Sequence, residues 1–159
     1  MKLIYTASQV REAEKPYIEA VDYDGYLMQR AADAVAAEAQ ELLHGTENAK
    51  ILLLIGPGNN GADTIYAGAR LSAKGHRVDA VIFDPSEKNL ELIAREGGEG
   101  TRVLDPEHTL EHLTGYDLTI DGILGTGSSG AVRGNAGEYL GVLRAAQLDG
   151  KLGAVLAVD

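Results

Sequence analysis

Two apolar runs in this chain each end in a glycine-rich loop of the same spacing. Residues 51–55 lead into the loop 56–61, and residues 118–124 lead into the loop 125–130. Glycine at these spacings lets a chain turn sharply off a buried strand and bring backbone N–H groups close to a ligand. The sequence therefore predicts that one structural event happens twice, in a fold built around a nucleotide.

Strand-like and helix-like segments alternate from residue 50 onward. We expect strands at 50–55, 77–83, 102–104, 117–124 and 153–158, and helices at 61–74, 86–95, 106–113 and 136–146. Two more helices, 6–20 and 26–43, precede the first strand, and Thr6 with Gln9 has the form of a capping box. Strands that are apolar on both faces and separated by helices predict an α/β fold with a mostly parallel sheet covered on both sides.

Composition limits the choice of partners and compartment. Fourteen Lys and Arg against twenty-four Asp and Glu give a net charge of −10, which disfavours a nucleic acid or an anionic membrane as partner. Cysteine is absent, so disulfides and thiolate metal sites are excluded. No apolar stretch approaches the ~20 residues that span a bilayer, and residues 1–5 lack the core of a signal peptide. We expect one cytoplasmic domain over residues 1–159.

The first loop has three ligand-binding interpretations and one purely structural one. A Walker A loop needs Lys and Ser or Thr where Ala62 and Asp63 stand, so that interpretation fails. A dinucleotide fingerprint would use Asp84 for the ribose, but Asn59 and Asn60 crowd the place of the pyrophosphate. A plain turn capped by Asn60 or Asp63 stays open. The third interpretation is a site for hydroxyls, an amide or a hard cation, which amide and carboxylate oxygens bind well.

The second loop follows an aspartate in an apolar strand. A carboxylate at Asp121 is costly there unless it meets a cation or hydrogen-bond donors, although it could simply cap its own loop. The hydroxyls of Thr126, Ser128 and Ser129 and the loop N–H groups could form an anion nest. Arg133 could bind a phosphate or brace the loop by pairing with an acid.

His108 and His112 lie four apart on an expected helix, a spacing that can bind zinc. No third ligand is evident from the sequence. Glu107 and Glu111 beside them make a solvated polar surface the simpler interpretation.

Several ordered motifs together resemble the NAD(P)H-hydrate epimerases, the YjeF N-terminal domain family. The motifs are residues 56–63, 69–71 with Gly75, 121–127, 132–133 and 158–159, preceded by 6–14 and 27–32. The resemblance covers essentially the whole chain. It implies a Rossmann-like three-layer α/β/α sandwich, often a homodimer, that epimerises the R and S forms of hydrated NADH or NADPH at C6 of the nicotinamide.

The resemblance also implies a set of site residues. Substrate contacts map to Asn59, Asn60, Gly61, Ala62, Asp63, Gly125, Thr126, Gly127, Ser128, Ser129, Gly130, Ala131 and Asp159. A potassium ion maps to Asn60 and Asp121, with a further Ser or Thr ligand three residues beyond Asp159. Our hypothesis for catalysis is that Asp121 holds K⁺ and positions the nicotinamide, while Asp159 handles a proton or the ribose; Asp63 is a third proton-carrier candidate.

Three departures from the family pattern matter. Ala62 and Thr64 stand where the family has glycine, and their methyl groups are either absorbed in a helix or narrow the site. Gly122 stands where the family tends to have Ala or another small residue, and we expect this change to be harmless. The family's Pro-Ser-Gly segment does not follow Asp159, so we expect a chain truncated at its C-terminal end, from an epimerase or the N-terminal half of a bifunctional epimerase/dehydratase.

Two further functions compete with this isomerase of cofactor repair. One is a non-catalytic nucleotide-binding or dimerising scaffold of the same fold, and the other is an ordinary NAD-dependent dehydrogenase. The enzyme is favoured over the scaffold by four polar residues, because a scaffold needs few polar groups around one cleft. They are Asn59, Asn60, Asp63 and Asp121. The two leading helices and the Asn pair disfavour the dehydrogenase.

Overall fold

A computed structural model describes residues 5–22, 25–84, 86–97, 100–125 and 131–158. Its five strands are β1 (Lys50–Ile55), β2 (Arg77–Ile82), β3 (Thr101–Val103), β4 (Leu118–Gly122) and β5 (Ala154–Ala157). They form one sheet in the order β3-β2-β1-β4-β5, and every neighbouring pair is parallel. This is the strand order of the Rossmann arrangement, and it confirms the predicted α/β class.

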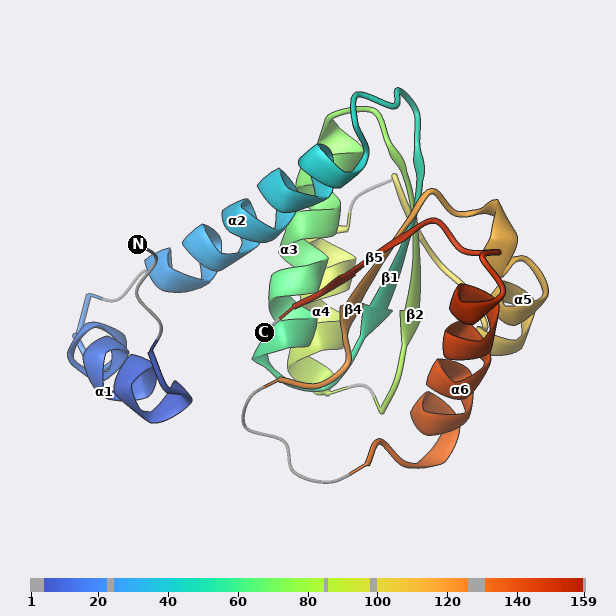
Figure 1. Cartoon of the computed structure of the whole chain (residues 1–159). Helices are drawn as coiled ribbons and strands as arrows, with labels where there is room; N and C mark the ends of the chain where they lie inside the picture. The colour runs from blue at the N-terminus through green and yellow to red at the C-terminus, as the bar shows by residue number, and fades with distance from the viewer. Residues whose placement is uncertain (1–4, 23–24, 85, 98–99, 126–130, 159) are drawn as a thin grey trace.

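Helices cover both faces of the sheet (Figure 1). One face carries α2 (Tyr26–Leu42), α3 (Asn59–Ala73) and α4 (Glu87–Glu96); the other carries α5 (Pro106–Glu111), the 3₁₀ turn η1 (Leu113–Gly115) and α6 (Gly134–Leu148). The three-layer sandwich is therefore as predicted. Among the described residues, none of these helices has the length and apolarity needed to cross a bilayer.

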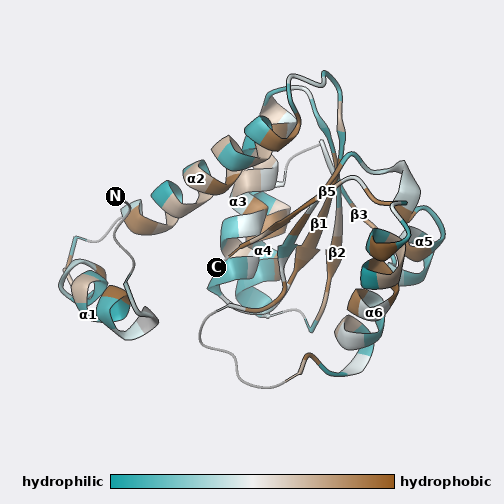
Figure 2. Ribbon diagram, viewed as in Figure 1, coloured by the Kyte–Doolittle hydropathy of each residue, from teal (hydrophilic) through white to brown (hydrophobic). Residues whose placement is uncertain are grey.

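The central strand β1 explains why its sequence is an unbroken apolar run. Ile51, Leu53 and Ile55 pack into the core beneath α2, α3 and α4, whereas Leu52 and Leu54 pack into the core beneath α5 and α6. All five are at most 1% exposed. Strands with two buried faces show as continuous brown bands between the helices in Figure 2.

The first helix, α1 (Ala7–Ile18), stands apart from the sheet (Figure 1). Its N-terminus has the predicted capping box, in which Thr6 and Gln9 exchange hydrogen bonds. The helix continues through Pro16 rather than breaking there. Among its residues whose burial is described, Glu14 alone is half-buried and the others are exposed.

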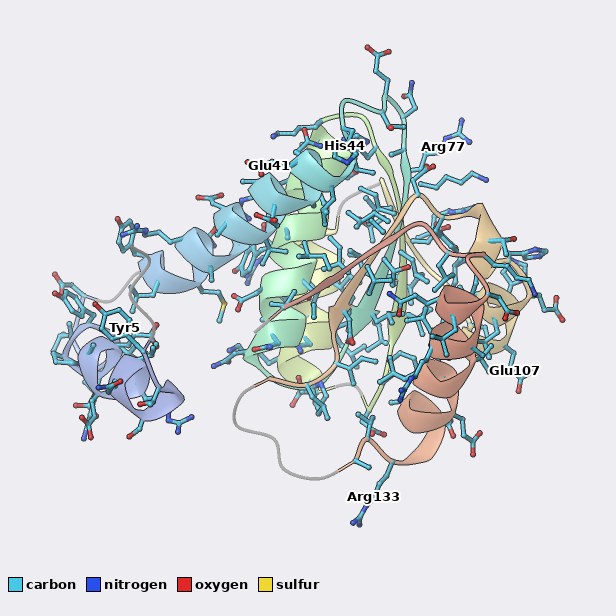
Figure 3. The ribbon with its side chains drawn as sticks, in the orientation of Figure 1. Tyr5, Glu41, His44, Arg77, Glu107 and Arg133 are labelled. Atoms are coloured by element: carbon cyan, nitrogen blue, oxygen red, sulfur yellow. The ribbon has the colours of Figure 1, made fainter. Side chains whose placement is uncertain are left out.

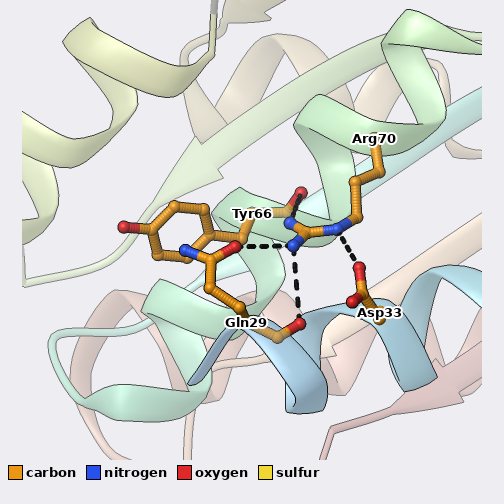
Figure 4. Close-up of polar contacts among 4 residues, drawn as sticks. All are labelled: Gln29, Asp33, Tyr66 and Arg70. Carbon is orange, nitrogen blue, oxygen red and sulfur yellow. Dashed lines mark hydrogen bonds and ion pairs between the residues drawn. The ribbon is translucent and has the colours of Figure 1, made fainter. Parts of the chain in front are cut away.

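Arg70 of α3 fixes α2 in place (Figure 4). Its guanidinium donates to Gln29 Oε1 at 2.6 Å and to the Tyr66 carbonyl at 3.0 Å, and it pairs with Asp33. These contacts join α2 to the helix whose first turns lie at the end of β1. The position of α3 is thus braced by a neighbouring helix of the same layer.

Candidate functional site

The candidate site lies where the sheet reverses its order of connection. From β1 the chain proceeds to β2 on one side, and from β4 it proceeds to β5 on the other. Loops that leave neighbouring parallel strands in opposite directions open a crevice at their carboxyl ends. Both glycine-rich loops begin there, and the Gly56 N–H donates to the Gly122 carbonyl at 3.2 Å.

The first loop enters its helix earlier than predicted. Helix α3 begins at Asn59 instead of Gly61, and its N-cap is Gly58, which forms no side-chain capping bond. The interpretation in which Asn60 or Asp63 caps the turn is therefore wrong. Since neither side chain is used by the helix end, both are available for other contacts.

Glycine is required in this loop by close backbone packing. A Cβ on Gly56 would lie 1.9 Å from the Ile123 carbonyl oxygen, and one on Gly61 would lie 2.1 Å from the Gly56 carbonyl oxygen. Real Cβ atoms essentially never approach so closely. The two glycines thus hold the end of β1, the end of β4 and the start of α3 against one another.

Asn89 of α4 supports the same loop from behind, and sequence reasoning missed it. Its buried Nδ2 donates to the carbonyls of Gly56 at 2.8 Å and Gly58 at 3.2 Å. A single Asn in an amphipathic helix belongs to no motif. The one available signal was a polar residue on the apolar face of that helix.

Asn60 links the two loops and the last strand. Its Nδ2 donates to the carbonyls of Leu124, at 3.2 Å, and Val158. Gly125 packs against this amide so closely that a Cβ there would lie 2.6 Å from it. With both amide hydrogens engaged by protein carbonyls, Oδ1 is the atom left to accept a hydrogen bond or to ligate a cation. Asn59 beside it is exposed.

Asp121 sits half-buried on β4, as the sequence suggested. Its Oδ1 accepts the Ile123 N–H at 3.1 Å, so the aspartate does cap its own loop. Burial raises the pKa of the Asp121 carboxyl, and the hydrogen bond from Ile123 only partly opposes the shift. Arg133 is exposed at the start of α6, points away from the sheet (Figure 3), and forms no ion pair with Asp121 among the described contacts.

Asp63 is the second half-buried acid of the site. Its Oδ1 is buried with no hydrogen-bond partner among the described residues. Burial, and after it the charge of Glu14 on α1, raises the pKa of Asp63 to about 6, while Lys88 opposes the shift. A carboxyl with this pKa can both give and take a proton near neutrality.

Thr64 and Gly122, two of the positions where the sequence was expected to depart from the family pattern, contact each other. Thr64 is fully buried, and its Oγ1 donates to the Asn60 carbonyl at 2.8 Å. The same Oγ1 atom would lie 2.0 Å from a Cβ added to Gly122. The larger residue on α3 thus occupies the space freed by the glycine on β4. Ala62 is also fully buried in the core. Both methyl groups are absorbed, and neither narrows the site.

The remaining predicted residues divide into three groups. Gly61 and Ala62 are buried, so only their backbone can face a ligand. Ala131 is exposed at the far side of the second loop. Thr126, Gly127, Ser128, Ser129, Gly130 and Asp159 lie outside the described residues.

Strand order and a polar site at the switch point define a Rossmann-like α/β protein. Within that class, the chain belongs to the family described as "YjeF-related protein N-terminus", whose sequence pattern matches residues 25–159. This match confirms the resemblance inferred from the ordered motifs.

Curated relatives include a bifunctional NAD(P)H-hydrate repair enzyme from Corynebacterium glutamicum, 36% identical over 83% of this chain and 23% of its own length. An NAD(P)H-hydrate epimerase from Microbacterium testaceum is 36% identical over 77% of this chain and 46% of its own. The chain thus spans less than half of either relative. A yeast protein of known crystal structure has the same fold, with a TM-score of 0.77 and 18% identity over 99% of this chain and 70% of its own.

Proposed function

We propose that this chain is an isomerase domain of nicotinamide-cofactor repair, which interconverts the R and S forms of hydrated NADH and NADPH at C6 of the nicotinamide. The observation that carries the proposal is the group Asn60, Asp63 and Asp121 at the switch point of a family member. The names of the curated relatives support it.

Epimerisation breaks and remakes a bond at C6, so it needs a proton donor and acceptor near the hydroxyl. We propose that Asp121 and Asp159 carry the reaction and that Asp63 is a further proton carrier, because its raised pKa suits proton exchange near neutrality. The proposed substrate contacts are the side chains and backbone of residues 59–63 and 125–131 and the carboxylate of Asp159.

The oxygen atoms of Asn60 and Asp121 suit a potassium ion. Asn60 has its Nδ2 engaged and its Oδ1 left as an acceptor, and Asp121 adds a carboxylate from the neighbouring strand. Oxygen donors of this kind suit a hard cation. We propose that these two residues hold K⁺, whose charge would favour the ionised form of Asp121.

The test is an assay of the R-hydrate coupled to an S-specific dehydratase, with the full-length protein. We expect Asp121→Asn to lower kcat by about 10²-fold or more, as for loss of an acid–base group. Asp149→Asn, an exposed carboxylate near the end of α6, is the control and leaves the rate unchanged. A parent protein that gives no acceleration over spontaneous epimerisation would favour the scaffold function instead.

Assembly and context complete the proposal. We propose that residues 1–159 act as one domain in the cytoplasm, as a homodimer, and that a dehydratase domain or partner removes the water from the S form. Exposed apolar side chains on and just after α1, Tyr17, Ile18 and Val21, support self-association through this outlying helix. Sedimentation equilibrium of the parent and of an Ile18→Lys variant would test the dimer.

A further inference from the structure

Three potential metal ligands meet on α5, on the face of the sheet opposite α3. The donor atoms of His108, Glu111 and His112 all lie within 4.8 Å of one another. Among the described residues this is the one group of three or more His, Cys, Asp or Glu side chains so arranged. None of the three belongs to the switch-point site.

Helical spacing brings the three together. Residues separated by three and four positions lie on one face of a helix, and His112 is the C-cap of α5. The two imidazole rings already lie side by side, with centroids 5.1 Å apart and an edge-to-face angle of 70°. Glu111 therefore supplies the third ligand that the His-to-His spacing alone did not reveal.

The backbone under these ligands is firmly held. Asp105 caps α5 by accepting the Glu107 N–H at 2.8 Å, and Pro106 occupies its first turn. On the inner side of the helix, the buried Thr109 hydroxyl lies 2.8 Å from the Tyr139 hydroxyl of α6. The ligand side chains are exposed while their helix is anchored, so they can rotate toward an ion without moving the fold.

Donor chemistry selects the kind of ion. Two imidazoles and one carboxylate suit a borderline divalent ion such as Zn²⁺, whereas K⁺ and Mg²⁺ prefer oxygen ligands alone. Tetrahedral zinc with bonds of about 2.0–2.2 Å places its ligand atoms roughly 3.5 Å apart. The three donor atoms lie within 4.8 Å of one another, so small side-chain rotations bring them to that distance.

Space for a fourth ligand adjoins the group. His108 and His112 line a cavity of about 780 Å³ at the amino ends of β1 and β2, together with Lys50, Arg77 and Arg102. Asp79 in the same cavity is already held by Arg102 through two bonds of 2.8 Å. Lys50 and Arg77 in this lining favour an anion as the fourth ligand of the ion.

From this arrangement we propose that His108, Glu111 and His112 bind one zinc ion, with an open fourth position. The ion is separate from the potassium proposed at the switch point. The site lies at the end of the sheet opposite that carboxyl edge, so it has no part in the epimerisation.

Calorimetric titration of the protein with ZnCl₂ in a non-coordinating buffer tests the site. We expect one ion per chain, and an affinity lowered at least about tenfold by His108→Ala or His112→Ala, which corresponds to the loss of one strong ligand. Glu111→Gln lowers it less. His44→Ala, an exposed histidine at the end of α2, is the matched control and binds as the parent does.

A second measurement uses Co²⁺ in place of zinc, since its visible spectrum reports ligands and geometry. The parent should show a spectrum typical of nitrogen ligation that is lost in the His108→Ala, His112→Ala double variant. Unchanged zinc affinity in that double variant, or binding weaker than about 1 mM in the parent, overturns the proposal. So does loss of zinc binding in Asp121→Asn, which would place the ion at the switch point. None of these results bears on the epimerase assay.

Discussion

The two glycine-rich loops share one sequence spacing but are followed by helices that begin at different distances from their strands. After β1 the chain turns at Gly58 directly into α3, whereas after β4 the next helix begins only at Gly134. The second loop therefore does not enter a helix directly, as the first one does. What the loops share is contact with each other, through Gly56 against Ile123 and Asn60 against Gly125. Glycine spacing indicates where backbones approach, and the polar residues between the glycines determine what each loop can bind.

The largest effect should come from placing a methyl group at the contact between the loops. We expect Gly56→Ala to lower the free energy of unfolding by about 3 kcal/mol, because its Cβ would meet the Ile123 carbonyl oxygen at 1.9 Å. Gly58→Ala in the same loop has nothing within 4 Å of its Cβ and should cost less than about 1 kcal/mol. Urea unfolding of both variants measures the difference; equal losses would contradict the packing role of Gly56.

A smaller loss of stability should show that Thr64 on α3 fills the space beside Gly122 on β4. We expect Gly122→Ala to cost about 2 kcal/mol by overpacking against Thr64 Oγ1, and Thr64→Ala about 1 kcal/mol by loss of its bond to the Asn60 carbonyl.

The double variant sharpens this test. Removing the Thr64 hydroxyl relieves the closest contact of the methyl group on residue 122, although the Asn60 carbonyl oxygen still lies 2.8 Å from it. The combined loss should therefore fall short of the sum by about 1 kcal/mol. Strict additivity in urea unfolding would mean that the two positions are independent.

The smallest effect concerns charge in the first loop. Because the folded pKa of Asp63 is raised to about 6 from 3.8, ionising it disfavours the folded state, and stability is lost as pH rises between about 4 and 6. Asp63→Asn should therefore be more stable than the parent at pH 7.5, by about 1 kcal/mol once solvent screening is allowed for, and the gain should shrink toward pH 4.5.

Urea unfolding at the two pH values measures this gain. Glu14→Gln removes one cause of the shift and should reduce the pH dependence of the parent. A gain from Asp63→Asn that is the same at both pH values would contradict the raised pKa.

Sequence alone was most informative where one local pattern decides the structure. The unbroken apolar run predicted β1 to the residue, and the Thr6 and Gln9 pair predicted the capping box of α1. Prediction was less exact at the switch point, where side-chain contacts decide where strands and helices end. Strand β4 was expected to reach Leu124 but ends at Gly122, since Asp121 takes the Ile123 N–H out of the ladder.

The supporting residues of the site show the same limit. Asn89 lies 33 positions from the Gly56 carbonyl that it holds, and Thr64 faces Gly122 only because α3 crosses the end of β4. Neither contact has a local signature. Asn60, Asp63 and Asp121 could be singled out beforehand because they lie in motifs, while their orientation and protonation depend on the folded surroundings.

The bond from Asn60 to the Val158 carbonyl has a consequence for the order of assembly. Its two ends lie 98 positions apart in the sequence, so during synthesis the first loop exists long before its partner does. Contacts of such separation close late, because the ends of a long segment must first be brought together. A growing chain can thus complete β1 and α3 while the amide still lacks its anchor. The orientation of Asn60 becomes fixed only when β5 has joined the sheet and brought Val158 beside it, which makes the switch-point site one of the last features to mature.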